Sequence, residues 1–202
     1  MDQYRCRPEE LPCNLYRVQY PESQTTRTDE GLKATNTTTF YGNSDYELGL
    51  FKQAVENHFT WSYRGRSPFI SFFSDREHAE NWGCTEPWGG SDPHRDQWTL
   101  CTIDTCLLEE IYVFKVSRLV DALGVRIPER AGQHEGGSYI CLHKVPARAI
   151  LEEKAGSDVK YGGDYYKEPW DPYWGYDSDD SAVRNNISDN CMRFLEDYDS
   201  RH

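Results

Sequence analysis

The chain has 202 residues, of which 37% are apolar and 14% are aromatic. This length fits one domain with an appendage, and the core must depend heavily on Tyr, Trp and Phe. Asp and Glu outnumber Lys and Arg by 34 to 22, and the formal net charge of −12 repels nucleic-acid phosphates and anionic lipids. We therefore expect neither a nucleic-acid partner nor a membrane partner, and no run of about 18 apolar residues marks a membrane helix.

The cysteines and the start of the chain bear on the compartment. No apolar signal core follows the polar start Met1–Arg7, so we expect a cytoplasmic protein with reduced thiols. Cys101 and Cys106 form a C-x4-C pair, for which packing inside the fold is favoured over a zinc site. No metal is expected.

An arginine interrupts the first predicted strand. Residues 1–13 form a polar lead, and the alternation in Asn14–Gln19 predicts a strand with Arg17 in its middle. The stem of Arg17 could cover apolar surface at a sheet edge. Alternatively, the guanidinium could point into a cleft and hold a phosphate or carboxylate.

A loop and a helix follow. Residues 21–40 are rich in Thr, Ser, Asn and Asp, which predicts a loop with a short strand near Thr37–Tyr41. Ser44 and Glu47 form a capping box, and apolar residues at helical spacing predict a helix over Asp45–Phe59. We expect His58, near the end of this helix, to be solvated and to interact with the helix dipole.

The stretch Ser67–Gly83 holds the most information. Phe69–Phe73 is an apolar run of strand type, and Ser74 with Glu77 matches a capping box that opens a helix ending near Gly83. Ser71 and Ser74 would then lie near backbone N–H groups that can hold an anion or a polar ligand. The alternative is a buried strand with one hydrogen-bonded serine, followed by a serine that only caps the helix.

Later segments complete an α+β pattern. Strands come in runs rather than in strict alternation with helices, which favours α+β. Ser117 is expected to cap a short helix, Leu119–Leu123, which Gly124 closes. The remaining predicted strands are Trp98–Ile103, Ile111–Lys115 and Ser138–Lys144, with loops at Cys84–Gln97 and Ala131–Gly137.

The composition changes after residue 154. Residues 161–180 contain seven aromatic residues, six acids and one lysine without a readable period. A weak helix is predicted at Val183–Leu195. We therefore divide the chain into the lead 1–13, a domain at 14–154 and an acidic, aromatic tail at 155–202, which could contact proteins because Tyr and Trp are common interface anchors.

The order of these motifs resembles a known group. Leu15-Tyr16-Arg17-Val18, then a helix, then Ser67-Pro68-Phe69-Ile70-Ser71 and Val145-Pro146-x-x-Ala149-Ile150 resemble a family of uncharacterised fungal domains. Those domains in turn look like the ADP-ribosyltransferase fold of the arginine-serine-glutamate type. The resemblance implies a split β-sandwich core with two or three flanking helices.

The resemblance also implies roles for particular residues. Arg17 would contact the phosphates of NAD, Ser71 with Ser74 would order the NAD pocket, and Glu135 would stabilise the reacting ribose. The serine motif departs from the family because Phe72 and Phe73 follow Ser71, and Gly136 and Gly137 separate Glu135 from the next strand. The implied activity is that of an ADP-ribosyltransferase or NAD glycohydrolase with a possible protein acceptor. The alternative is an inactive module that binds proteins.

Overall fold

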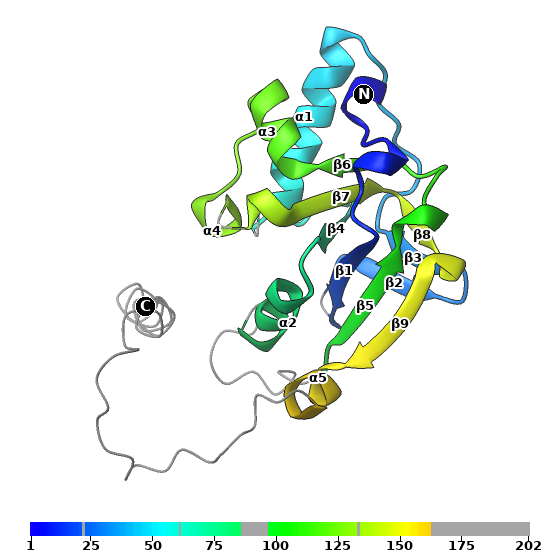
Figure 1. Cartoon of the computed structure of the whole chain (residues 1–202). Coiled ribbons are helices and arrows are strands. Elements are labelled where there is room, and N and C mark those ends of the chain that lie inside the picture. The colour runs from blue at the N-terminus through cyan, green and yellow to red at the C-terminus, as the bar shows by residue number, and fades with distance from the viewer. Residues whose placement is uncertain (22, 61, 86–96, 133, 163–202) are drawn as a thin grey trace, which may run out of the picture. The chain divides into compact units, whose positions relative to one another are not determined.

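The computed structural model describes residues 1–21, 23–60, 62–85, 97–132 and 134–162, and they form two antiparallel sheets with helices beside them (Figure 1). The larger sheet has the strand order β6-β7-β4-β1-β5-β9, and the smaller has the order β2-β3-β8. The predicted α+β class is confirmed. The strands are β1 (Asn14–Gln19), β2 (Thr25–Thr28), β3 (Gly31–Ala34), β4 (Phe69–Phe73), β5 (Thr99–Asp104), β6 (Val113–Lys115), β7 (Ser138–Leu142), β8 (Lys144–Pro146) and β9 (Ile150–Ala155).

One face of the larger sheet packs against the smaller sheet. Side chains at alternate positions of a strand share a face, so Leu15, Ile70 and Cys101 of the larger sheet meet Leu32 and Val145 of the smaller one. These residues are 1% exposed or less. Their burial is the main stabilising contribution to the two-sheet core.

Helices cover the other face in two separate clusters. One cluster joins α1 (Asp45–Phe59) and α3 (Val116–Leu123) to β4, β6 and β7 through Phe51, Phe69 and Phe114. The other joins α2 (Arg76–Thr85) to β1 and β5 through Ala79 and Trp98. Shorter helices are α4 (Glu129–Gly132), α5 (Gly156–Gly162) and the 3-10 turns η1 (Asp2–Tyr4), η2 (Pro8–Glu10), η3 (Thr105–Leu107), η4 (Glu135–Gly137) and η5 (Ala147–Ala149).

The helix ends follow their local chemistry, with two corrections to the sequence analysis. The Ser44–Glu47 capping box begins α1 as predicted. At α2 the Asp75 carboxylate, and not Ser74, accepts the hydrogen bond from the His78 backbone N–H at 2.6 Å. Ser117 lies inside α3, because the helix begins one residue earlier, and Gly124 ends it with a left-handed φ of 60°.

Polar and charged strands account for the main errors in secondary structure. The hairpin β2–β3 occupies the predicted loop. Residues 37–41 contain no strand, because the Asn36 side chain accepts the backbone N–H groups of Thr38 and Thr39 in a turn. The predicted strand Ser138–Lys144 is divided at His143, whose φ is 68°.

Two further findings concern membrane-spanning helices and cysteines. No helix among residues 1–162, apart from the gaps in the described ranges, is long and apolar enough to cross a membrane. The described cysteines are free thiols. The predicted helix Val183–Leu195 and Cys191 lie outside the described residues.

Candidate functional site

Strands β1 and β4 separate near the middle of the larger sheet. β1 pairs with β5 along its full length, from Asn14 with Asp104 to Gln19 with Thr99, but it pairs with β4 at Tyr16 and Phe73. The carbonyl of Ser71 therefore lies where strand pairing has stopped. A backbone acceptor inside a sheet needs another donor at such a point.

Arg17 supplies that donor. Its Nη1 donates to the Ser71 carbonyl oxygen at 3.0 Å, its Nε to Gln19 Oε1 at 3.0 Å and its Nη2 to Ser23 Oγ at 2.6 Å. All three partners are neutral, and the residue is 6% exposed. Burial lowers the pKa of the guanidinium, which nevertheless stays charged. The site therefore contains a buried positive charge whose hydrogen-bond partners carry no negative charge.

His58 lies in the field of this charge. Desolvation, with a smaller contribution from Arg17, lowers the pKa of His58 to about 3, so the ring is neutral near pH 7. Its Nδ1 is 2.7 Å from Ser67 Oγ, and its ring packs edge to face on Phe69 with 5.7 Å between the ring centroids. The prediction of a solvated histidine at the helix end was wrong, because α1 packs its last turn onto the start of β4.

Ser71 occupies the boundary between the two helix clusters. Its neighbours on the same face of β4 are Phe69, which packs with α1, and Phe73, which packs beside α2. Its hydroxyl makes no hydrogen bond with a described residue. Arg17 points to the opposite face of the sheet, toward Cys101 and Cys141, so it reaches the backbone of Ser71 and not its hydroxyl.

Ser74 lies against η4, the turn that contains Glu135, at the C-terminal end of β4. The Ser74 backbone N–H donates to the Gly137 carbonyl at 2.8 Å, which holds η4 against the beginning of α2. Glu135 opens this turn, and its half-buried carboxylate makes no hydrogen bond or ion pair with a described residue. β7 begins at Ser138, whose hydroxyl donates to the His134 carbonyl at 2.5 Å.

Two histidines connect the same segments. His78 Nε2 and His134 Nδ1 are 2.7 Å apart, and the rings cross edge to face at 4.7 Å. Phe73 contacts both rings. The sequence gives no sign of this pair, because 56 residues separate the two histidines and the nearby motifs concern other side chains. Only the pairing of β4 with β7 brings them together.

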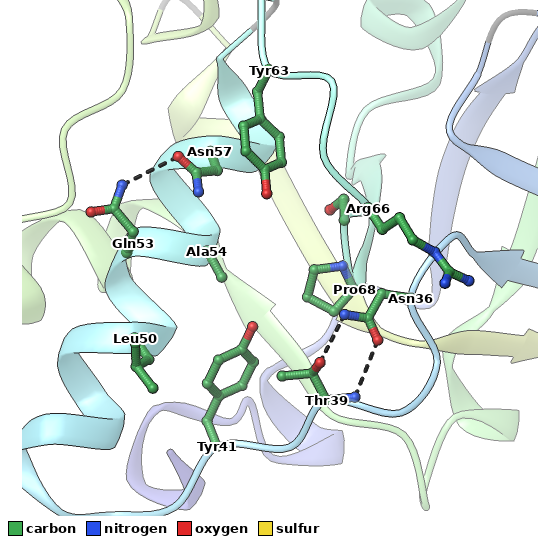
Figure 2. Close-up of a pocket in the computed structure, with 11 residues that line it drawn as sticks. Asn36, Thr39, Tyr41, Leu50, Gln53, Ala54, Asn57, Tyr63, Arg66 and Pro68 are labelled. Carbon is green, nitrogen blue, oxygen red and sulfur yellow. Dashed lines mark hydrogen bonds between the residues drawn. The ribbon is translucent and has the colours of Figure 1, made fainter.

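A pocket lies at the other end of β4. It has a volume of about 260 Å³ and is lined by α1, the loop before it and residues 63–68. In Figure 2 the hydroxyls of Tyr41 and Tyr63 point into it from opposite sides, with Ala54 and Pro68 between them, and the Arg66 guanidinium points away. None of the four predicted site residues, Arg17, Ser71, Ser74 and Glu135, lines this pocket.

Comparisons with known proteins give a family and two distant structures. Residues 10–159 match the family described as "Domain of unknown function (DUF7587)". No curated protein matches the chain. Among solved structures, "EcPltA" is 14% identical, with 70% of this chain and 74% of that chain covered and a TM-score of 0.43. The DarT protein of Thermus sp. 2.9, in complex with ADP-ribosylated ssDNA, is 13% identical, with 74% and 83% covered and a TM-score of 0.35.

Proposed function

Because this chain belongs to the DUF7587 family, a domain of unknown function, its activity must be inferred from its site, and we propose that it cleaves the nicotinamide–ribose bond of NAD. It would act as an ADP-ribosyltransferase or as an NAD glycohydrolase. The observation that carries the proposal is the Arg17–Ser71 contact, in which a buried cation with neutral partners lies where β1 and β4 separate. The guanidinium points to the face opposite the Ser71 hydroxyl, so a dianionic pyrophosphate beside Ser71 would be attracted by this charge across the sheet and would not contact it directly.

The boundary between the helix clusters offers the other groups that NAD requires. The Ser71 hydroxyl is without a protein partner among the described residues, and half-buried Tyr16 and Phe73 flank it on the same face of the sheet. A small hydroxyl between aromatic rings suits the ring and amide of a nicotinamide riboside. Glu135, whose carboxylate makes no hydrogen bond or ion pair with a described residue, belongs to η4, which the Ser74–Gly137 hydrogen bond attaches beyond Phe73 at the end of β4.

The chemistry follows from these residue types. The C1′–N1 bond of NAD breaks, and nicotinamide leaves with the electron pair and becomes neutral. The positive charge that develops at C1′ would be stabilised by the Glu135 carboxylate. Water or an acceptor nucleophile then bonds to C1′ and loses one proton. We propose a protein acceptor, because the net charge of −12 opposes nucleic acid.

A catalytically inactive module of the same fold, acting in protein–protein interaction, is the second candidate. It is favoured by the position of Glu135 in η4, before β7, whereas the residue that opens the strand is Ser138. A carboxylate held by a turn is less rigidly placed than one on a strand.

Nicotinamide release distinguishes the two candidates. The wild-type protein is incubated with NAD beside Glu135→Gln and the control Glu129→Gln, which changes an exposed carboxylate of α4. We expect release by the wild type and the control, and a loss of about 100-fold or more in Glu135→Gln. NAD binding without release would favour the inactive module. If the wild-type protein neither binds NAD nor releases nicotinamide, the proposal is rejected.

A further inference from the structure

We propose that His78 and His134 form a positioning pair that holds the η4 turn, and with it Glu135, against α2. The inference rests on the proposed function only where it concerns the role of Glu135. The anchoring itself concerns the protein alone and can be tested without NAD.

Two hydrogen-bonded contacts among the described residues attach η4 to α2 and to the residue just before its cap. The first is the backbone hydrogen bond from Ser74 to Gly137, which fixes the end of η4. The second is the 2.7 Å contact between His78 Nε2 and His134 Nδ1, which fixes the residue just before its start. Glu135 lies between these two attachment points. Two contacts on either side of Glu135 restrain the turn more than one contact would, because one contact alone leaves the turn able to rotate.

Neighbouring groups fix the backbone of both histidines, and Phe73 packs against both rings. The backbone N–H of His78 is bound by the Asp75 cap, which sets its position in the first turn of α2. The His134 carbonyl accepts the Ser138 hydroxyl, and the His134 N–H donates to the Ala131 carbonyl at 3.2 Å. The centroid of the Phe73 ring lies 4.9 Å from that of His78 and 6.0 Å from that of His134. Because Phe73 already restricts both rings, they lose less rotational freedom when they bond to each other than two solvated side chains would.

The hydrogen bond and the ring packing can be separated by substitution. Gln places an amide near the position of the His Nε2 atom, so His78→Gln keeps a group that can bond to His134. His78→Phe keeps the aromatic contact with Phe73 but cannot form the hydrogen bond. Gln53→Leu is a matched control, because it removes a side-chain hydrogen bond of 3.2 Å on exposed α1, to Asn57, far from η4 in the sequence.

Hydrogen exchange of the purified protein tests the anchor. We follow the amides of Ser74, which donates to Gly137, and of Ser138, which donates to Glu135. We expect His78→Phe to speed their exchange about 3- to 10-fold, and His78→Gln and Gln53→Leu to leave it nearly unchanged. Equal exchange in His78→Phe and the wild type, or equally fast exchange in His78→Phe and His78→Gln, would overturn the proposal.

Kinetics then test the role of Glu135. If the wild type releases nicotinamide, His78→Phe should lower kcat severalfold with little change in KM, because a carboxylate that acts in the transition state is misplaced. His78→Gln should restore kcat. A change in KM alone would contradict the positioning of Glu135. If the wild type releases no nicotinamide, the proposed function fails, while hydrogen exchange still decides whether the pair anchors the turn.

Discussion

Two basic side chains, the buried Arg17 and the half-buried His58, set the electrostatics of the site. Arg17 remains charged among neutral partners, whereas burial and the nearby Arg17 keep His58 neutral. Both responses follow from desolvation, because a guanidinium cannot give up its proton in proteins and an imidazole can. Each residue therefore makes a separate contribution to stability that can be measured.

We expect acid to destabilise the protein through His58. Its folded pKa of about 3 lies below the ordinary value of about 6.5, so the unfolded chain binds more protons between these values. Stability is therefore lost as the pH falls from about 6.5 toward 3. His58→Asn keeps an amide near Nδ1 for Ser67 but does not titrate. Between pH 7 and pH 5 the wild type should lose up to about 2 kcal/mol more than the variant.

Urea unfolding at the two pH values measures this difference. The titration of the carboxylates is common to both proteins and cancels in the comparison. Parallel pH dependence in wild type and His58→Asn would show that His58 is protonated in the folded state.

We expect substitution of Arg17 to lower the free energy of unfolding, although the Arg17 side chain carries a charge that no acidic partner among the described residues neutralises. Arg17→Ala leaves a cavity and an unbonded Ser71 carbonyl in the sheet, and we expect a loss of about 2–4 kcal/mol in the free energy of unfolding. Arg27→Ala is the control, because Arg27 pairs with Glu153 at 2.9 Å with its side chain 36% exposed. Its loss should not exceed about 1 kcal/mol. Similar losses in chemical denaturation would contradict the structural role of Arg17.

At the scale of elements, α2 connects the candidate site to the rest of the fold. Its N-terminus carries the Asp75 cap and His78, and its last turn approaches Trp98. A Cβ at Gly83 would lie 2.8 Å from the Trp98 ring, and one at Gly156 would lie 2.4 Å from it. The indole is thus enclosed between α2 and the start of α5, and these close approaches explain the two glycines.

The cap of α2 can be assigned by two substitutions. Asp75→Ala removes the acceptor of the His78 N–H and should lower the free energy of unfolding by about 1 kcal/mol. Ser74→Ala removes a hydroxyl that has no hydrogen bond with a described residue, so its effect should stay within about 0.5 kcal/mol. Thermal unfolding of both variants measures the difference, and a larger effect of Ser74→Ala would restore the capping box inferred from the sequence.

Elements with a strong local pattern were predictable from the sequence. The bounds of Asn14–Gln19, Asp45–Phe59 and Phe69–Phe73 agree with the structure, because their apolar periodicity and caps are encoded nearby. β2 and β9 were missed, since Thr-Thr-Arg-Thr and Ile-Leu-Glu-Glu-Lys-Ala have no clear alternation. Their pairing partners are distant in the chain, and pairing decides their conformation.

The candidate site was predictable only in part, for the same reason. A contact between Arg17 and the Ser71 backbone could be expected if their two strands are adjacent. That the Arg17 and Ser71 side chains point to opposite faces of the sheet depends on the register of β1 and β4, which the sequence does not show. The burial of His58 and the pairing of His78 with His134 arise from tertiary packing alone. The roles of Arg17, Ser71, Ser74 and Glu135 toward NAD remain predictions.

At the scale of the whole described domain, the sandwich depends on how the smaller sheet returns to the core. β3 pairs with β8 from Gly31 with Pro146 to Lys33 with Lys144, and β8 follows β7 of the larger sheet after His143. His143 is 8% exposed, and its Nε2 hydrogen-bonds to the Thr39 carbonyl at 2.7 Å. The chain thus passes from the larger to the smaller sheet at His143, a residue of positive φ. β8 must then pack closely against β3.

β3 and β8 approach each other most closely at Gly31. We expect the substitution of Gly31 to destabilise the domain more than the other substitutions do. Its φ is +124°, and a Cβ would lie 2.0 Å from the Val145 carbonyl oxygen and 2.7 Å from the Ala147 nitrogen. Because the obstructing atoms are backbone, the sheets must separate, and we expect Gly31→Ala to lower the free energy of unfolding by about 3 kcal/mol or more.

Gly49 provides the opposite result from the same chemical change. It lies on the exposed side of α1 with nothing within 4 Å of an added Cβ, so Gly49→Ala should raise the free energy of unfolding by about 0.5–1 kcal/mol through helix propensity. Urea unfolding of both variants tests the argument. A tolerated Gly31→Ala would mean that β3 and β8 need not approach closely, and that the smaller sheet is held mainly by its apolar face.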